Sequence, residues 1–469
     1  MPERDVPSIR RWLQSGRGHA HFVGIGGVGM AGLAFLASKT GIRVSGCDLL
    51  ESRITAWLRA NGIEVFTGHD PVHIDDTVTA VVRTTAVKSN APEVSRAREQ
   101  GIPVYMRGAV LAALIDGRAS IAVTGTHGKT TTATFTAQLL TACGRDPSFC
   151  IGAEVAGDGA VAGAGGGPLL VAEADESDGT VALYRPETAV LTNIEYDHME
   201  HFRNEADMEN CFLTFARAAR KNVVWCKDDP GLCRVLSDLN GGVTFGFSGD
   251  ADCRAAVETM SADSATIRLF WRGDDQGLFT YAVAGRHNAL NAASAAAVAH
   301  LYGCSFDEIR KGFSSLRLAR RRFEQVCDLN GVRVISDYAH HPTEIRALID
   351  LARMQPHKRI IAVFQPHRYT RTLALGPQFV PACAGVDQLI LAPVYPASEA
   401  PLDGGRIGDL HGHFLKANAL NVELAESLQD AWNKARIMLQ PGDLFLVIGA
   451  GDVEVVSQWA KDYLLSYAP

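Results

Sequence analysis

Residues 125–132, with the sequence Gly-Thr-His-Gly-Lys-Thr-Thr-Thr, constrain the fold of this chain more than any other segment. They follow the apolar run 120–124 and precede a helix-like stretch at 133–140. A strand that leads through a glycine loop into a helix offers an anion several backbone N–H groups and the positive end of the helix dipole. Lys129 adds a positive charge, and the hydroxyl of Thr130 can reach a bound Mg²⁺ ion. The segment therefore predicts an α/β domain that binds nucleotide phosphates.

Length and composition predict a soluble protein of several domains. The 469 residues correspond to about three domains of ~150 residues, and 47% hydrophobic residues provide ample core. The net charge of −7, without a block of Lys and Arg, argues against nucleic-acid binding. No apolar run reaches the ~18 residues of a membrane span, and residues 1–18 lack the apolar core of an export signal. A cytoplasmic location is therefore expected.

The ten cysteines are scattered along the chain without a Cys-x-x-Cys pair. Structural zinc sites and disulfide frameworks usually show regular cysteine spacing. We therefore expect reduced thiols, and neither a zinc site nor a disulfide framework.

Residues 1–117 are typical of a Rossmann-like domain. Gly24, Gly26 and Gly29 match the Gly-x-Gly-x-x-Gly fingerprint of dinucleotide sites, and Asp48 supplies an acidic residue about 20 positions on. Because such glycines bind a diphosphate and not a nicotinamide, NAD and another pyrophosphate ligand are equally compatible here. The expected elements are strands at 21–25, 43–46 and 79–82, a turn at 26–29, a helix at 30–40 and a further βα repeat at 110–115.

Residues 118–318 form a second predicted segment, in which carboxylates follow the strand expected at 168–172. Carboxylate oxygens at the end of a strand, beside a phosphate loop, are suitable ligands for Mg²⁺; a solvated acidic loop is the alternative. The carboxylates are Glu173, Asp175 and Glu176.

Two further positions in this segment leave alternatives open. His198 follows the strand expected at 188–194, and is either a second metal ligand or a surface histidine. His287 and Asn291 begin an alanine-rich helix, where such side chains either cap the helix or contact a nucleotide base.

Residues 319–469 form the third predicted segment. Arg320–Arg322 lie at its start, where an arginine either belongs to a solvated linker or stabilises a transferring phosphate. Each later strand ends in a polar cluster, and the carboxyl ends of parallel strands form the ligand sites of open α/β sheets. The strands are expected at 332–336, 360–364, 389–391 and 444–448.

Taken together, these strings resemble the Mur ligase family over essentially the whole chain. The most specific strings lie at 124–130, 173–178, 337–344 and 364–372. The last of them is typical of the branch that adds L-alanine, and separates it from the branch that reattaches a recycled tripeptide. The resemblance implies an α/β ligase of three domains: a Rossmann-like domain at 1–117 for a UDP-sugar, a central P-loop-type domain at 118–318 for ATP and Mg²⁺, and a Rossmann-like domain at 319–469 for the amino acid.

The resemblance also implies a role for particular residues. The ATP site would comprise Gly125, Thr126, His127, Gly128, Lys129, Thr130, Thr131, His287, Asn291 and Asp337. The UDP-sugar site would comprise Gly24, Gly26, Gly27, Gly29, Asp48, Thr84 and Thr85. The amino-acid site would comprise Tyr338, His340, His367, Arg368 and Arg371. The metal ligands would be Thr130, Glu173 and His198, and the catalytic residues Lys129, His198, Arg322 and His340.

The implied reaction joins L-alanine to the carboxylate of UDP-N-acetylmuramic acid through an acyl phosphate, with release of ADP and phosphate. His340 is hypothesised to take the proton of the attacking amine. Arg83-Thr84-Thr85 departs from the serines that relatives usually show near the sugar nucleotide. Other ligases of the family, an NAD-dependent oxidoreductase and a non-enzymatic nucleotide switch remain alternatives, and the oligomeric state stays open.

Overall fold

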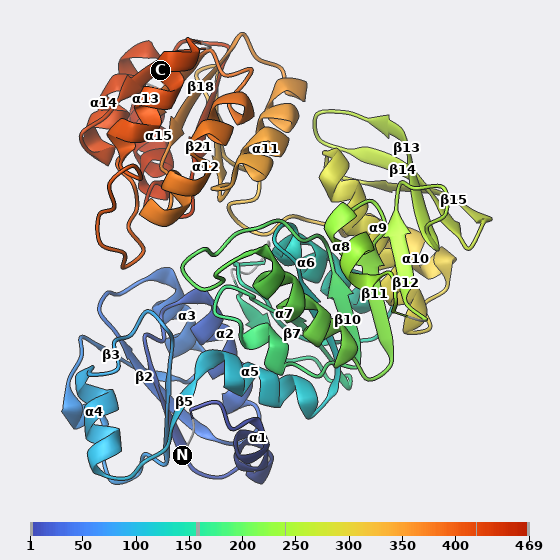
Figure 1. Cartoon of the computed structure of the whole chain (residues 1–469), viewed down its shortest axis with the longest axis vertical. Helices are drawn as coiled ribbons and strands as arrows, with labels where there is room; N and C mark the ends of the chain where they lie inside the picture. Colours follow the sequence, from blue (N-terminus) through green and yellow to red (C-terminus); the bar gives the residue numbers. More distant parts are fainter. Residues whose placement is uncertain (1–2, 156–159, 240, 419, 467–469) are drawn as a thin grey trace.

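The computed structural model describes residues 3–155, 160–239, 241–418 and 420–466. It contains three sheets, which succeed one another along the chain and belong to three lobes coloured blue, green to yellow, and orange to red in Figure 1. Apart from added antiparallel strands, each sheet is parallel and carries helices between its strands. The predicted α/β class is thereby confirmed. Within the described ranges, no helix has both the length and the apolar character that crossing a membrane requires.

The N-terminal sheet has the strand order β3-β2-β1-β4-β5. Its order reverses between β1 and β4, and open α/β sheets bind ligands at such a switch point. The strands are β1 His19–Val23, β2 Arg43–Asp48, β3 Glu64–Thr67, β4 Ala80–Arg83 and β5 Val104–Met106. The helices are α1 Val6–Ser15, α2 Val28–Ser38, α3 Arg53–Ala60, η1 Pro71–His73, α4 Pro92–Glu99 and α5 Arg107–Asp116.

The central sheet has the order β15-β14-β13-β12-β11-β10-β6-β9-β7-β8. Strand β6, which leads into the phosphate loop, lies between β9 and β10, so three carboxyl ends meet at one place. The strands are β6 Ala119–Thr124, β7 Ser148–Cys150, β8 Ala162–Gly163, β9 Leu169–Glu173, β10 Thr188–Leu191, β11 Asn222–Cys226, β12 Val243–Gly246, β13 Cys253–Met260, β14 Ala265–Trp271 and β15 Asp274–Tyr281. The helices are α6 Lys129–Ala142, η2 Thr180–Leu183, α7 Glu205–Arg217, α8 Pro230–Leu236, α9 Arg286–Leu301 and α10 Phe306–Phe313.

The C-terminal sheet has the order β16-β17-β21-β18-β19-β20. The strands with polar ends, β17, β21, β18 and β19, are therefore parallel neighbours. The strands are β16 Glu324–Leu329, β17 Val332–Asp337, β18 Arg359–Phe364, β19 Gln388–Leu391, β20 Asn421–Leu424 and β21 Asp443–Ile448. The helices are α11 Pro342–Met354, α12 Tyr369–Ala382, α13 Ile407–Ala417, α14 Leu428–Met438 and α15 Glu454–Ser466.

Some local expectations were wrong. Helix α2 begins at Val28, so Gly29 lies inside its first turn and not in the preceding turn. Residues 110–115 belong to helix α5, and the strand before them is β5. That run is apolar on every side and fully buried, so it carries no periodicity that distinguishes a strand from a helix.

The cores show how the lobes are joined. One hydrophobic cluster contains residues of both the N-terminal and the central sheets, for example Phe22 and Phe135. The C-terminal sheet has its own two clusters, one on each face, which include Phe364 and Trp432. The first two lobes are thus fused by apolar packing, whereas the third contacts them mainly through polar residues. The boundaries proposed at 117 and 318 stay predictions.

Candidate active site

The conformation of the phosphate loop is fixed by hydrogen bonds to the loop that follows β10. Asn193 accepts two of them, at its backbone oxygen from the N–H of Thr126 (3.1 Å) and at Oδ1 from the N–H of His127 (2.8 Å). Gly125 and Gly128 have φ of +131° and +79°, which side chains disfavour. The glycines therefore allow the backbone to curve around an anion ahead of helix α6.

Acidic residues surround the cation of this loop. Lys129 Nζ lies 2.8 Å from Glu176 Oε1 and donates to the backbone oxygen of Gly125 at 2.6 Å. Burial alone would lower the pKa of Lys129, but Glu176 and Asp175 raise it, so the amine is charged. Its charge is available to phosphate once the ion pair with Glu176 is exchanged.

The predicted metal ligands lie next to this pair. Thr130 Oγ1 donates to Glu173 Oε1 at 3.0 Å, and His198 Nε2 lies 3.4 Å from Glu176 Oε1. Burial would lower the pKa of His198, whereas its carboxylate neighbours raise it to about 10. The oxygen donors of Thr130 and Glu173 fit Mg²⁺, and Glu176 Oε2 is buried nearby without a hydrogen-bond partner. His198 would have to lose its proton before its nitrogen could bind a metal.

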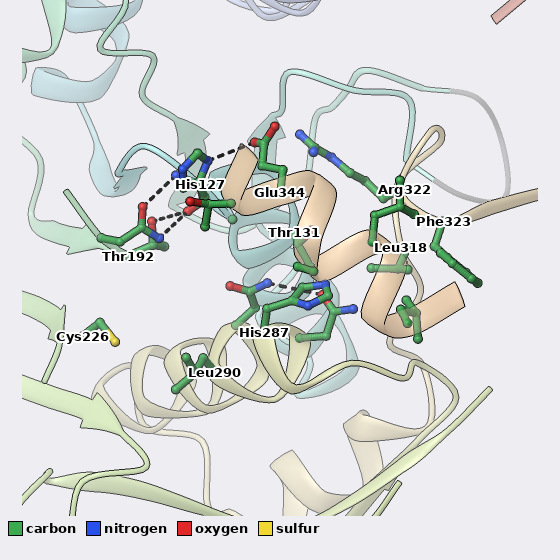
Figure 2. A pocket seen from close by; sticks show the side chains of 18 of the residues that line it. His127, Thr131, Thr192, Cys226, His287, Leu290, Leu318, Arg322, Phe323 and Glu344 are labelled. Carbon is green, nitrogen blue, oxygen red and sulfur yellow. Dashed lines mark hydrogen bonds and ion pairs between the residues drawn. The ribbon is translucent and has the colours of Figure 1, made fainter. Parts of the chain in front are cut away.

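A cavity of about 290 Å³ opens beside the phosphate loop. Figure 2 shows His287 and Thr131 facing it from helices α9 and α6, with Arg322 and Phe323 opposite. Burial lowers the pKa of His287 to about 4, so the imidazole is neutral and suited to a nucleotide base. Asn291 also lines the cavity, and its Oδ1 accepts from Thr132 Oγ1 at 3.1 Å.

Asp337 lines the same cavity from the end of β17. Its two carboxylate oxygens accept backbone N–H groups of Phe323 (2.7 Å) and Ala339 (2.8 Å). The Asp337 side chain therefore connects the end of β17 to the segment before β16. Because both of its oxygens already accept a hydrogen bond, fewer of their lone pairs remain to accept one from a ribose hydroxyl.

His127 connects the central and C-terminal lobes. One ring nitrogen lies 2.9 Å from Glu195 Oε2 and the other 3.0 Å from Glu344 Oε1, as the dashed line to Glu344 in Figure 2 illustrates for one of them. Burial alone would lower the pKa of His127, but the two carboxylates raise it to about 9. An imidazolium between two carboxylates therefore joins these lobes next to the phosphate loop.

The three arginines at the domain junction differ in their contacts. Arg320 pairs with Glu154, Glu324 and Glu454, and Arg321 contacts the backbone oxygen of Gly449. Arg322 instead reaches the phosphate loop, with Nη2 3.4 Å from Thr130 Oγ1, and lines both the cavity beside that loop and a second, larger cavity. Of the three, Arg322 is the one placed to contact a phosphoryl group.

A second cavity, of about 460 Å³, is lined from all three lobes. Val28 and Gly29 of α2, Lys129 of α6 and Arg368 at the start of α12 all line it. It holds most of the remaining predicted residues: Thr130, Glu173, His198, Tyr338, His340, His367 and Arg371. The predicted metal, phosphate and amino-acid residues thus share one space.

The residues predicted to bind the amino-acid substrate differ in how accessible their side chains are. Arg371 is 2% exposed and makes a double hydrogen bond to Asp197, at 3.0 and 2.9 Å. Arg368 is a quarter exposed, has φ of +72° and pairs with Glu399 at 3.2 Å. Both arginines line the cavity and pair with carboxylates of the central lobe, since Arg368 Nε also lies 3.5 Å from Glu200 Oε1. Arg368 differs in being a quarter exposed, so its guanidinium is the more accessible of the two to a substrate carboxylate.

The histidines of this cluster are neutral. Burial lowers the pKa of His340 to about 4 and that of His367 to about 2. His340 Nδ1 lies 2.9 Å from the backbone oxygen of Tyr338, which can only accept, so Nδ1 carries the proton. The Nε2 atom of His340 is then unprotonated.

The predicted UDP-sugar residues lie around the end of β1. Gly24 has φ of +80°, and the N–H of Gly26 donates to Asp48 Oδ2 at 2.8 Å, so Asp48 shapes the glycine loop itself. Arg83 pairs with Glu3 at 2.7 Å and donates to the backbone oxygen of Val87 at 3.1 Å, so its side chain is held by contacts within this lobe. Of this set, only Gly29 lines the large cavity, and Gly27 caps helix α2.

Several site residues escaped the sequence prediction. Arg107 lines the large cavity and pairs with Asp175 at 3.0 Å. The others hold the loop or join the lobes: Asn193, Glu195, Asp197 and Glu344. Their positions in the sequence, after β10 and at the start of α11, could have indicated that these residues belong to the site. The partner that each one contacts depends on the tertiary structure.

Sequence profiles of one family cover most of the chain. The Mur ligase family, catalytic domain, matches residues 19–119, the Mur ligase middle domain residues 123–299, and the Mur ligase, glutamate ligase domain residues 321–451. The chain belongs to the Mur ligase family. The resemblance inferred from its motifs is thereby confirmed, and so is the order of the three Mur ligase regions.

Individual members of the Mur ligase family are similar over nearly the whole length. UDP-N-acetylmuramate–L-alanine ligase of Gloeobacter violaceus is 40% identical over 92% of this chain and 93% of its own, and that of Acidothermus cellulolyticus 40% identical over 95% of both. The crystal structure of UDP-N-acetylmuramate-alanine ligase from Thermotoga maritima superimposes with a TM-score of 0.82 at 27% identity, covering 96% of this chain and all (100%) of the other. A murein peptide ligase from Psychrobacter arcticus has the same fold, with a TM-score of 0.73 at 23% identity over 97% of this chain and 100% of its own.

Proposed function

We propose that this protein joins L-alanine to the carboxylate of UDP-N-acetylmuramic acid and converts ATP to ADP and phosphate, a step in peptidoglycan precursor synthesis. One observation carries the proposal: a single cavity is lined by the start of α2, by the phosphate loop and by the polar cluster of the C-terminal sheet. A ligase must bring its acceptor, its nucleotide and its amino acid to one place. The 40% identical relatives of that name support the choice of substrates.

The first step activates the carboxylate. A carboxylate is a poor electrophile, so the γ-phosphoryl group of ATP is transferred to it and an acyl phosphate forms. Several negative charges then lie close together, and Lys129, Arg322 and the start of helix α6 stabilise them. Phosphoryl transfer needs positioning and charge stabilisation more than covalent help.

Mg²⁺ is the proposed metal cofactor, and Thr130, Glu173 and His198 are its proposed ligands. When bound, it neutralises phosphate oxygens and orients them. Lys129 exchanges Glu176 for phosphate as the nucleotide binds, which frees carboxylate oxygens for a cation.

The second step forms the amide bond. The amine of L-alanine must be neutral to attack the acyl phosphate, and phosphate then leaves. His340 Nε2, unprotonated in the same cavity, is the proposed base. Arg368 is the proposed partner of the alanine carboxylate. The contacts between lobes exclude the water that would hydrolyse the acyl phosphate.

A peptide-adding sibling ligase is the second candidate, because a murein peptide ligase shares the fold. The string at 364–372 favours L-alanine over this alternative. An NAD-dependent oxidoreductase would leave the phosphate loop without a role. We further propose that the reaction takes place in the cytoplasm, where ATP is available.

Phosphate release tests the proposal. The protein is supplied with ATP, Mg²⁺ and UDP-N-acetylmuramic acid, and L-alanine is compared with glycine, L-serine, D-glutamate and a tripeptide. Release that requires both the sugar nucleotide and L-alanine supports the assignment. Release only with the tripeptide or a D-amino acid assigns a sibling activity, and no release with any acceptor refutes the ligase.

A further inference from the structure

A second cluster of metal-binding side chains lies in the N-terminal lobe, outside both cavities described above. Cys47 belongs to β2, His69 follows β3, and Glu93 lies in the first turn of α4. The Cys47 and Glu93 residues have no exposed surface (0%), and the His69 side chain is 22% exposed, so the cluster is buried with one route to solvent.

The distances among these three side chains match a metal site. Cys47 Sγ lies 3.2 Å from Glu93 Oε1 and 3.5 Å from His69 Nδ1, which itself lies 3.2 Å from the same Glu93 oxygen. Ligand atoms of a tetrahedral Zn²⁺, with bonds of about 2.0–2.3 Å, are separated by about 3.3–3.6 Å. The three atoms are therefore spaced like one face of such a tetrahedron. His73 Nδ1 also lies 3.2 Å from Glu93 Oε1, but His73 is not among the three residues whose ligand atoms all lie within 4.8 Å of one another.

Unpartnered atoms provide independent support. Glu93 Oε2 and His21 Nε2 are buried without a hydrogen-bond partner, although buried polar atoms are normally paired. His21 is fully buried, and its ring stacks on that of His73 at 5.8 Å. Meanwhile the Cys47 thiol, the N–H of Asp70 and both neighbouring histidines crowd around the other Glu93 oxygen. A divalent cation bound by both oxygens of Glu93 would give Oε2 the partner that it lacks.

We propose that Cys47, His69 and Glu93 bind a divalent cation of the zinc class, with a water molecule in the fourth position. Thiolate and imidazole donors favour zinc and its neighbours over Mg²⁺ or Ca²⁺. The absence of a Cys-x-x-Cys pair does not count against a site that uses one cysteine.

The proposed metal site lies next to the glycine loop of the same lobe, through the end of β2. The backbone oxygen of Cys47 accepts the N–H groups of Gly24 (2.8 Å) and Ile25 (3.0 Å), and the next residue, Asp48, holds Gly26. A metal on Cys47 therefore fixes the end of β2 on which this loop rests. The assignment is separate from the proposed ligase activity and needs no substrate for its test.

Cobalt binding tests the proposal on the full chain after treatment with a chelator and in excess Mg²⁺. We expect one equivalent of Co²⁺ with tetrahedral absorption bands and a thiolate-to-cobalt charge-transfer band, all removed by Zn²⁺. Cys47→Ser should abolish the charge-transfer band. Cys150→Ser is the matched control, because Cys150 is a buried thiol that lines the cavity of about 460 Å³, away from the proposed site, and it should keep the band.

A second variant guards against misfolding of Cys47→Ser. His69→Gln replaces a partly exposed side chain, and should weaken Zn²⁺ binding at least tenfold and remove the rise in melting temperature that Zn²⁺ gives the unchanged protein. Folded protein that binds no Co²⁺ through thiolate overturns the proposal. A band that survives Cys47→Ser, or disappears in Cys150→Ser, overturns it as well.

Discussion

Lys129 and Glu176 form a buried ion pair in the candidate active site. The side chain of Glu176 is 1% exposed and that of Lys129 14%, and their ion pair of 2.8 Å stabilises each group against burial. Removing one partner of a buried pair leaves an uncompensated charge, which typically costs about 3–5 kcal/mol. The same pair must open when phosphate binds, so it couples stability to nucleotide binding.

Replacing Lys129 should therefore damage stability and activity separately. Lys129→Met should lower the melting temperature by several degrees, corresponding to about 3–5 kcal/mol, and reduce phosphate release to background. The double variant Lys129→Met with Glu176→Gln should recover the melting temperature but not the activity. Thermal melting and phosphate release on the same samples check this. A double variant as unstable as the single one would show that the pair is not the source of the loss.

At Arg322, the effect of the positive charge on activity can be distinguished from the effect of the planar guanidinium shape. Arg322→Lys keeps the positive charge but loses the planar fork, so kcat/KM should fall about 10²–10³-fold with little change in melting temperature. Arg317→Lys is the control, because Arg317 is an exposed arginine of the same segment whose side chain contacts only backbone oxygens, and it should behave like the unchanged protein. Equal activity of the two variants would contradict the role given to Arg322.

At the scale of elements, the phosphate loop depends on how closely α6 and α9 pack. Helix α9 is rich in alanine, and its small side chains let it approach α6 closely enough for Asn291 to reach Thr132. A Cβ atom on Gly128 would lie 2.8 Å from Asn291 Oδ1. The loop therefore requires glycine for its backbone angle and for space.

Gly128→Ala should reduce ATP affinity at least a hundredfold. Gly144→Ala, just beyond the other end of α6, is the matched control: its φ of +73° is similar to the +79° of Gly128, but no atom lies within 4 Å of the added Cβ. Both variants carry the left-handed strain of about 1–2 kcal/mol, and only Gly128→Ala adds the clash. Titration with a fluorescent ATP analogue measures the difference. An ATP affinity in Gly128→Ala equal to that in Gly144→Ala would contradict the role given to the clash with Asn291.

At the scale of the whole molecule, the lobes are joined in two ways. Apolar packing fuses the N-terminal and central lobes, whereas the C-terminal lobe contacts the centre through ion pairs such as Arg371–Asp197 and His127–Glu344. Polar contacts can be broken and remade in water at lower cost than a continuous core. We therefore expect relative motion of the lobes near residues 316–320 more than near 116–119.

The contact of His127 makes stability depend on pH. Its folded pKa of about 9 exceeds the ordinary value of 6.5, so the stabilisation is complete below pH 6.5 and is lost as the pH rises to about 9. The pKa values of Glu195 and Glu344 are lowered, so both remain charged throughout this range. The melting temperature should fall between pH 6.5 and 9, and fall less in His127→Gln. Parallel melting curves for the two proteins would refute the imidazolium bridge.

The sequence alone determined the fold class, the phosphate loop and the strand-end clusters, because each depends on residues that are adjacent in the chain. Gly125, Gly128 and Lys129 follow a strand and precede a helix, and this local order is sufficient to predict an anion site. The family-specific strings then predicted many of the polar residues that line the large cavity, including Glu173 and His367.

The tertiary structure decided which of these residues are free to act. Arg320, Arg321 and Arg322 are consecutive and chemically equivalent in sequence, and only their contacts across the lobes distinguish them. The pairing of Arg371 with Asp197, 174 residues away along the chain, likewise has no local signal. Local patterns specify elements, whereas partners distant in sequence are selected by packing and by the pairing of buried charges.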